Sequence, residues 1–67
     1  MSAHAIYPGE YFILKREKGR DNWQLLFRDD SLSTMDLRYR YQAEKLQPGE
    51  ALRYERPDGT VMAEVEK

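Results

Sequence analysis

Residues 32–46 read LSTMDLRYRYQAEKL, and whether they form a helix or a strand determines the fold class of the chain. Ser33 is suited to cap a helix, Asp36 suits its first turn and Lys45 its last. Pro48-Gly49 would end it. We therefore predict a helix, and good helix formers fill its second half. Its apolar face, built from residues three or four apart, would consist of Leu32, Met35, Tyr39, Ala43 and Leu46.

The same residues also fit a strand, because Met35, Leu37, Tyr39, Tyr41 and Ala43 alternate with polar neighbours. The chain would then form five or six short strands and close into a small all-β SH3-like barrel. Such a strand would be very long or would need a break that no residue marks. The helix is therefore favoured, with the barrel as the alternative.

A hairpin is predicted before this stretch, from strands at Tyr11–Arg16 and Trp23–Arg28 with a polar loop between them. Side chains alternate along a strand, so Trp23, Leu25 and Phe27 would share one face. In a chain with a thin core, we expect three aromatic residues of this hairpin to be buried, namely Phe12, Trp23 and Phe27.

A second hairpin is predicted after it, from strands at Ala51–Arg56 and Thr60–Glu66. The turn between them is Pro57-Asp58-Gly59. Proline presets its own φ, aspartate offers a local hydrogen-bond acceptor and glycine tolerates positive φ. In its second strand, alternation places on one face Val61, Ala63 and Val65.

The predicted fold is therefore α+β: a two-layer ββαββ domain in which one helix covers one face of a four-stranded antiparallel sheet. The 67 residues allow a single small domain, placed at 10–67 after a flexible N-terminus at 1–9. This order of elements, with the closing hairpin LRYERPDGTV at 52–61, resembles small bacterial ββαββ domains of unknown function and some phage-encoded inhibitors of host defence. The likeness is one of topology, and no residue role is carried over from it.

Composition limits the classes of function. Twelve acidic and eleven basic side chains give a net charge of −1, which excludes a bulk polycation and an acidic tail domain. Without cysteine there is no disulfide and no thiolate nucleophile or ligand. No signal peptide or run of about 20 apolar residues is visible, so we expect a cytoplasmic protein with no membrane partner.

No residue pattern predicts catalysis. His4 is the sole histidine, near the N-terminus and without a ligand partner close in sequence. Ser31, Ser33 and Thr34 suit helix capping, and no glycine-framed nucleophile turn is present. The acidic residues at 29–36 lack the spacing and central glycine of a calcium loop. The sequence therefore predicts no enzyme, no catalytic residue, no metal site and no cofactor.

Arginine and tyrosine residues instead predict a binding surface. If Tyr39 packs inward, Tyr41 is turned about 200° away and exposed, between Arg38 and Arg40. Both residue types are enriched in protein–protein hot spots. We predict a non-catalytic protein–protein interaction module, a small bacterial or phage inhibitor or adaptor of a larger host protein. It would dock through this surface or through the uncovered sheet face; the predicted partner-binding set is Arg38, Arg40, Tyr41, Arg53 and Tyr54.

The alternative function is a nucleic-acid-binding regulator that uses the same arginines and tyrosines. Basic residues around the first hairpin would assist, namely Lys15, Arg16, Lys18 and Arg20. A pI of about 5.8 counts against it, because nucleic-acid-binding domains commonly have a pI above about 9. The C-terminal strand is also predicted to be an edge strand, through which two copies could pair as a homodimer.

Overall fold

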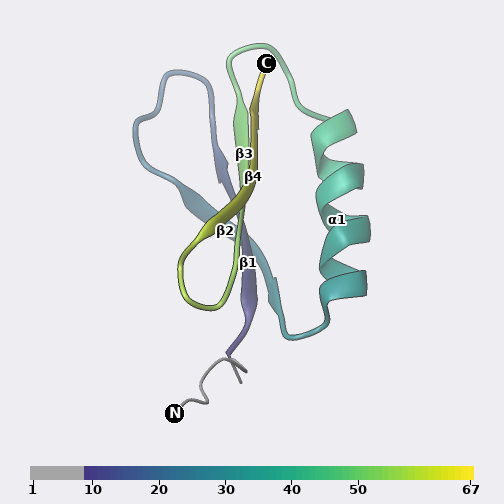
Figure 1. Ribbon diagram of the computed structural model, residues 1–67. Helices are drawn as coiled ribbons and strands as arrows, with labels where there is room; N and C mark the ends of the chain where they lie inside the picture. The colour runs from purple at the N-terminus through teal and green to yellow at the C-terminus, as the bar shows by residue number, and fades with distance from the viewer. Residues whose placement is uncertain (1–8) are drawn as a thin grey trace.

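The chain folds into two layers, a four-stranded antiparallel sheet and one helix that crosses a single face of it (Figure 1). The computed structural model describes residues 9–67; the predicted flexible N-terminus, with His4, lies almost wholly outside them. The strand order is β2-β1-β3-β4. This confirms the α+β ββαββ prediction, and the SH3-like barrel is wrong because residues 32–44 are helical. The elements are β1 Tyr11–Arg16, β2 Gln24–Asp29, α1 Leu32–Glu44, β3 Ala51–Glu55 and β4 Val61–Glu66.

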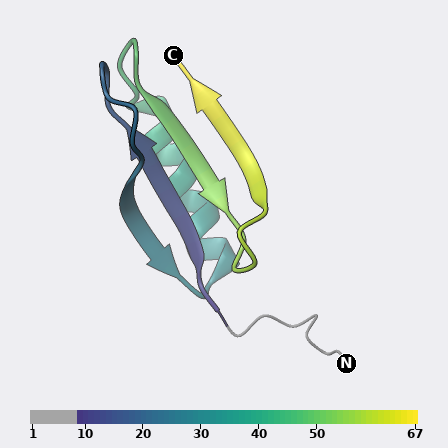
Figure 2. The ribbon, with the colours of Figure 1, turned by 90° about the vertical axis from the view of Figure 1, so that its left-hand side faces the viewer.

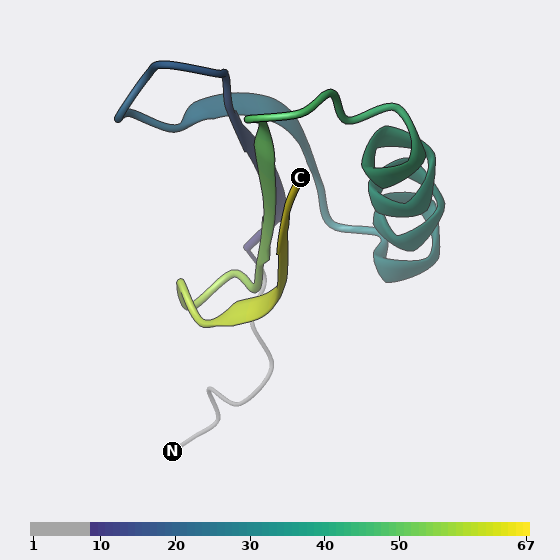
Figure 3. The same cartoon turned by 90° about the horizontal axis from the view of Figure 1, so that it is seen from above.

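Helix α1 runs along the sheet behind β1, β2 and β3 (Figure 2). From above, the two hairpin loops project on the side away from the helix (Figure 3). The sheet therefore has one face covered by α1 and one face with no element over it among residues 9–67. We refer to these as the helix face and the open face.

The helix begins at a different cap from the one predicted. Ser31, not Ser33, is the N-cap: its backbone is extended, and its Oγ accepts a hydrogen bond of 3.3 Å from the Thr34 amide. The amide of Ser31 in turn donates to Asp29 Oδ1 at 2.8 Å, which holds the chain where β2 leads into the helix. Ser33 comes two residues later, inside the first turn of the helix, and its hydroxyl lies 3.3 Å from that of Ser31. At the other end the helix stops at Glu44, two residues before the predicted Leu46.

A bulge in each hairpin reverses the alternation that the sequence suggests. In the first, Ile13 pairs with Phe27 but Leu14 pairs with Leu25, so Leu26 is an additional residue. Because paired residues point to the same side of a sheet, Phe27 lies on the helix face and Leu25 on the open face. The prediction that Trp23, Leu25 and Phe27 share a face is therefore wrong.

The second hairpin repeats this irregularity. Tyr54 pairs with Ala63 and Glu55 pairs with Val61, which leaves Met62 as the additional residue. Val61 consequently lies on the open face, opposite to Ala63, although simple alternation predicts that they lie together. Bulges of this kind also increase the local twist of the strands.

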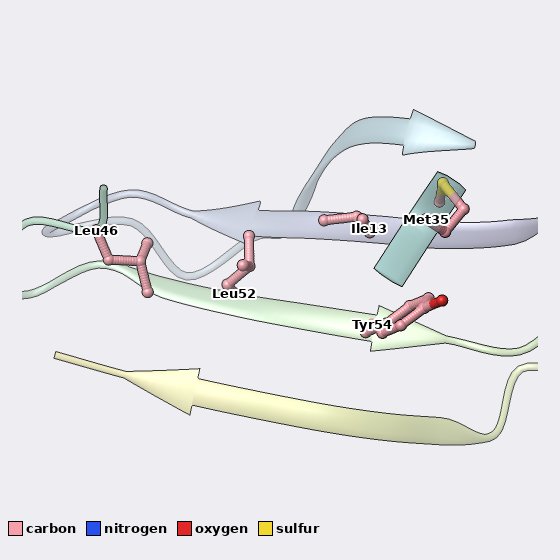
Figure 4. Close-up of a cluster of buried hydrophobic side chains, with 5 residues drawn as sticks. All are labelled: Ile13, Met35, Leu46, Leu52 and Tyr54. Carbon is pink, nitrogen blue, oxygen red and sulfur yellow. The ribbon is translucent and has the colours of Figure 1, made fainter. Parts of the chain in front are cut away.

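The core lies between the sheet and the helix (Figure 4). Ile13, Met35 and Leu52 are fully buried, and each buried aliphatic side chain of this size contributes about 1.5–3 kcal/mol through removal of apolar surface from water. Two of the three aromatic residues predicted for the core are not in it, because Phe12 and Trp23 lie on the open face. The remaining members of the buried cluster are Leu46 and Tyr54, and the partly buried residues packed on it are Tyr11, Phe27, Tyr39, Ala43, Met62 and Ala63.

Tyr54 connects the two layers. Its ring stacks on Tyr39 of α1 with centroids 5.2 Å apart, and it lies 6.3 Å from the ring of Tyr11. Its hydroxyl donates a hydrogen bond of 2.9 Å to Asp36 Oδ1. Burial, followed by this hydrogen bond, raises the pKa of the Tyr54 hydroxyl well above the ordinary value for tyrosine. Asp36 therefore serves as the acceptor for a core tyrosine rather than as a first-turn partner of the helix dipole.

Candidate interaction surface on helix α1

The outer side of α1 carries the two most exposed large hydrophobic side chains among residues 9–67. Leu37 is 67% exposed and Tyr41 is 59% exposed. They are four residues apart and so lie one turn apart on the same side of the helix. That side is opposite to Met35 and Tyr39, which face the sheet. The adjacent pair of exposed apolar residues is the main feature of this surface.

Basic side chains flank the apolar pair on both sides. At about 100° per residue, Arg38 and Lys45 lie on one side of the Leu37–Tyr41 line and Arg40 lies on the other. The Arg38 guanidinium packs 4.6 Å from the ring centroid of Phe27 in β2. We use the name helix surface for these five residues, Leu37, Arg38, Arg40, Tyr41 and Lys45.

Lys45 contacts the Tyr41 side chain. Its ammonium lies 4.7 Å from the Tyr41 ring centroid and donates a hydrogen bond of 3.5 Å to the Tyr41 hydroxyl. A cation over an exposed aromatic ring contributes about 0.5–1 kcal/mol. The contact therefore favours one orientation of the Tyr41 ring in the free protein, which reduces part of the entropy that binding must remove.

The cations of the strands are ion-paired, whereas those of the helix surface are not. Within residues 9–67, no carboxylate lies within 4.0 Å of Arg38, Arg40 or Lys45. All twelve acidic side chains of the protein belong to this part of the chain, so none of them lies within 4.0 Å of these three cations. The pairs formed by strand cations are Lys15–Glu50 at 3.4 Å, Arg16–Glu66 at 3.1 Å, Arg28–Glu10 at 3.5 Å, and Arg53 with Glu64 at 2.9 Å and with Glu55 at 3.8 Å.

The other two predicted partner-binding residues lie elsewhere. Tyr54 is only 4% exposed and belongs to the core, so it is not available to a partner. Arg53 is adjacent to it on β3 and therefore points to the open face. The structure thus brings together Arg38, Arg40 and Tyr41, and it separates Arg53 and Tyr54 from them.

The open face carries a second cluster, centred on Trp23. The guanidinium carbons of Arg53 and Arg16 lie 4.2 Å and 5.2 Å from the centroid of its ring. Both arginines are also paired with glutamates of β4, Glu64 and Glu66. The cationic charge of this cluster is therefore already balanced, which distinguishes it from the helix surface.

The four residues predicted to assist nucleic-acid binding do not form one patch. Lys15 and Arg16 are consecutive residues of β1, so they point to opposite faces, and each is paired with a glutamate. Lys18 and Arg20 are exposed in the loop between β1 and β2. The structure therefore distributes these cations over three regions of the surface.

Leu37 and Lys45 belong to the helix surface but not to the predicted partner-binding set. The sequence pattern gives Leu37 a place only in the alternation of the strand alternative. Once α1 is helical with Met35 and Tyr39 inward, the same rotation that exposes Tyr41 also exposes Leu37. The helical periodicity was therefore a sufficient signal to find it.

Residues 9–67 provide neither a ligand pocket nor a metal site. That part of the chain contains no detectable pocket and no group of three or more histidine or acidic residues placed to hold a metal ion. No helix in the same range is long and apolar enough to cross a membrane.

Comparison with protein-family models, with curated proteins and with solved structures finds no match to this chain.

Proposed function

We propose that this protein is a non-catalytic protein–protein interaction module that docks the helix surface onto a larger protein, as an adaptor or inhibitor. The observation that carries the proposal is the exposure of Leu37 and Tyr41 side by side. An isolated exposed apolar residue is ordinary, but adjacent large ones rimmed by polar residues are typical of interaction sites.

The composition of the helix surface supports the same proposal. Tyrosine and arginine are among the residues that most often dominate binding energy, and they do so when the partner removes them from water. Arg38 and Arg40 present planar guanidinium groups that can make two hydrogen bonds to a carboxylate. We also propose a cytoplasmic location, because a chain without cysteine gains no disulfide from an oxidising compartment.

The test measures which proteins are captured from a lysate of the native host by the wild type, by a triple variant of the helix surface and by a control variant. We expect the triple variant Arg38→Ala, Arg40→Ala, Tyr41→Ala to lose the proteins that the wild type retains. Its thermal unfolding should change little, because all three side chains are exposed and alanine favours a helix. Leu25→Ala is the matched control, since Leu25 is 50% exposed on the open face. Unaltered capture by the triple variant would remove the helix surface as the site.

The nucleic-acid alternative is tested with short single- and double-stranded oligonucleotides by fluorescence polarisation. The proposal expects no binding at micromolar protein. Binding that weakens steeply as salt increases would favour the regulator instead, because phosphate contacts release counterions.

A further inference from the structure

We infer that the segment of the partner that covers the helix surface is acidic, with an apolar side chain flanked on both sides by carboxylates. This inference rests on the proposed function and adds the chemistry of the partner to it. Its basis is the contrast between the ion-paired cations of the sheet and the unpaired cations of α1.

Charge on the helix surface is not balanced by the protein itself. Three cations surround Leu37 and Tyr41, and Glu44 is the acidic residue that α1 places on the same side. The carboxylate of Asp36 is directed to the hydroxyl of Tyr54 at the layer boundary. The local surface is therefore positive although the whole chain has a net charge of −1. A partner with carboxylates at this place gains attraction and a faster rate of association.

The spacing of the apolar and cationic side chains on the helix surface indicates how the partner's segment is arranged. Leu37 and Tyr41 are about 6 Å apart along the helix axis, at about 1.5 Å per residue. Arg38 and Lys45 lie to one side of this line, about 10 Å apart along the axis, and Arg40 lies to the other. An apolar residue of the partner that contacts Leu37 and Tyr41 would therefore have cations on both sides of it. Carboxylates on each side of that apolar residue would complete the contact.

A nucleic acid fits this surface less well than an acidic peptide. A phosphate backbone would pair with the cations but would offer nothing apolar to cover Leu37, the most exposed large hydrophobic residue of the part described. The open face offers little additional attraction, because its arginines Arg16 and Arg53 are already paired with glutamates, namely Glu55, Glu64 and Glu66.

A second copy of the chain also fits less well. The exposed apolar residue Val65 of β4 lies on the helix face, whereas its neighbours Glu64 and Glu66 point to the open face and are already paired with Arg53 and Arg16. To use them, a second copy would have to break its own ion pairs. An acidic segment of a different protein is the occupant that carries no such cost.

The experiment selects ligands from a phage-displayed library of random 16-residue peptides on the immobilised full chain. We expect the enriched peptides to share a large apolar residue flanked by aspartate or glutamate. Their binding should weaken about tenfold or more in the variant Leu37→Ala, Tyr41→Ala, which is a loss of about 1.4 kcal/mol. The variant Arg38→Glu, Arg40→Glu should instead enrich peptides with lysine or arginine at the flanking positions.

A charge-matched control separates a local effect from a general one. Arg20→Glu, Arg56→Glu changes the net charge equally at two exposed residues far from the helix surface in sequence, and it should enrich the same acidic peptides as the wild type. Far-ultraviolet circular dichroism verifies that each variant keeps its fold.

The contrary outcomes are distinct. If the enriched peptides require Leu37 and Tyr41 but carry no excess of carboxylates, the partner chemistry is wrong and the proposed surface stands. If no enriched peptide depends on Leu37 and Tyr41, both the inference and the proposed function are wrong. Sedimentation that shows a dimer abolished by Leu37→Ala, Tyr41→Ala would assign the surface to a second copy and overturn the inference.

Discussion

Replacing Tyr54 with phenylalanine removes a single oxygen atom and tests how the helix is attached to the sheet. The Tyr54 hydroxyl donates to Asp36 Oδ1 at 2.9 Å, and this is a hydrogen bond to a charged acceptor between β3 and α1. Such bonds contribute about 1.5–3 kcal/mol when both partners are buried. Asp36 is only half-buried, so water replaces part of the lost bond. We therefore expect Tyr54→Phe to lower the free energy of unfolding by about 1–2 kcal/mol.

That loss is large for this chain. At about 0.05–0.15 kcal/mol per residue, 67 residues have a total stability of roughly 3–10 kcal/mol. In domains of this size, 1 kcal/mol shifts Tm by about 4–8 °C, so Tm should fall by about 5–15 °C. Urea unfolding should show a lower midpoint and an unchanged m-value, since the core stays equally buried.

A double-mutant cycle assigns the effect to the pair. Asp36→Ala and Tyr54→Phe should together cost less than the sum of the two single changes, because each removes the same bond. Asp36→Asn is the matched control, since it keeps an acceptor oxygen but no charge. The reasoning is refuted if Tyr54→Phe unfolds within about 0.3 kcal/mol of the wild type, or if the two effects simply add.

Two further predictions concern the same fold. Burial is the main cause that raises the pKa values of Tyr39 and Tyr54, so above about pH 10 the unfolded chain loses protons that the folded chain keeps. Stability should therefore decrease as pH rises above 10, by up to about 1.4 kcal/mol per pH unit for each tyrosine. Urea unfolding measured between pH 8 and 11.5 gives the free energy of unfolding at each pH. This free energy should decrease less steeply with pH in Tyr54→Phe than in the wild type, and an equal decrease in both would contradict the prediction. Ser31→Ala should cost about 1 kcal/mol because it removes the N-cap, and Ser33→Ala close to nothing. If thermal unfolding shows the same loss of stability in Ser31→Ala and Ser33→Ala, the two serines share the capping role and the prediction is wrong.

The second hairpin shows how much can be predicted where the signals are local. The predicted turn at 57–59 is observed, with Gly59 at φ +90° and the Thr60 amide donating to Asp58 Oδ1 at 2.9 Å. This bond is the main cause that lowers the pKa of the Asp58 carboxyl. The predicted strands differ from β3 and β4 by one residue at one end of each. A turn of this kind depends on the φ preferences and side-chain acceptors of a few consecutive residues, so the sequence contains what is needed.

Part of the candidate surface was predictable for a similar reason. The rotation per residue of a helix whose inward residue is Tyr39 predicts that Tyr41 is exposed, and Arg38 and Arg40 flank Tyr41 in sequence. The structure places Tyr39 against the core and Tyr41 outward. Leu37 follows from the same rotation. The helix and its inward face are enough for these assignments, because exposure on a helix is set by angle alone.

Residues in the sheet required the tertiary structure. By itself the sequence determined the ββαββ order, the turn chemistry and the inward side of α1, all of which arise from neighbours within a few positions. Only the fold decided that Trp23 lies on the open face beside Arg53 and that Tyr54 is buried beneath the helix. Those outcomes depend on the extra residues Leu26 and Met62 and on which sheet face the helix covers. Strand register and layer packing join residues far apart in the chain, so no local pattern contains them.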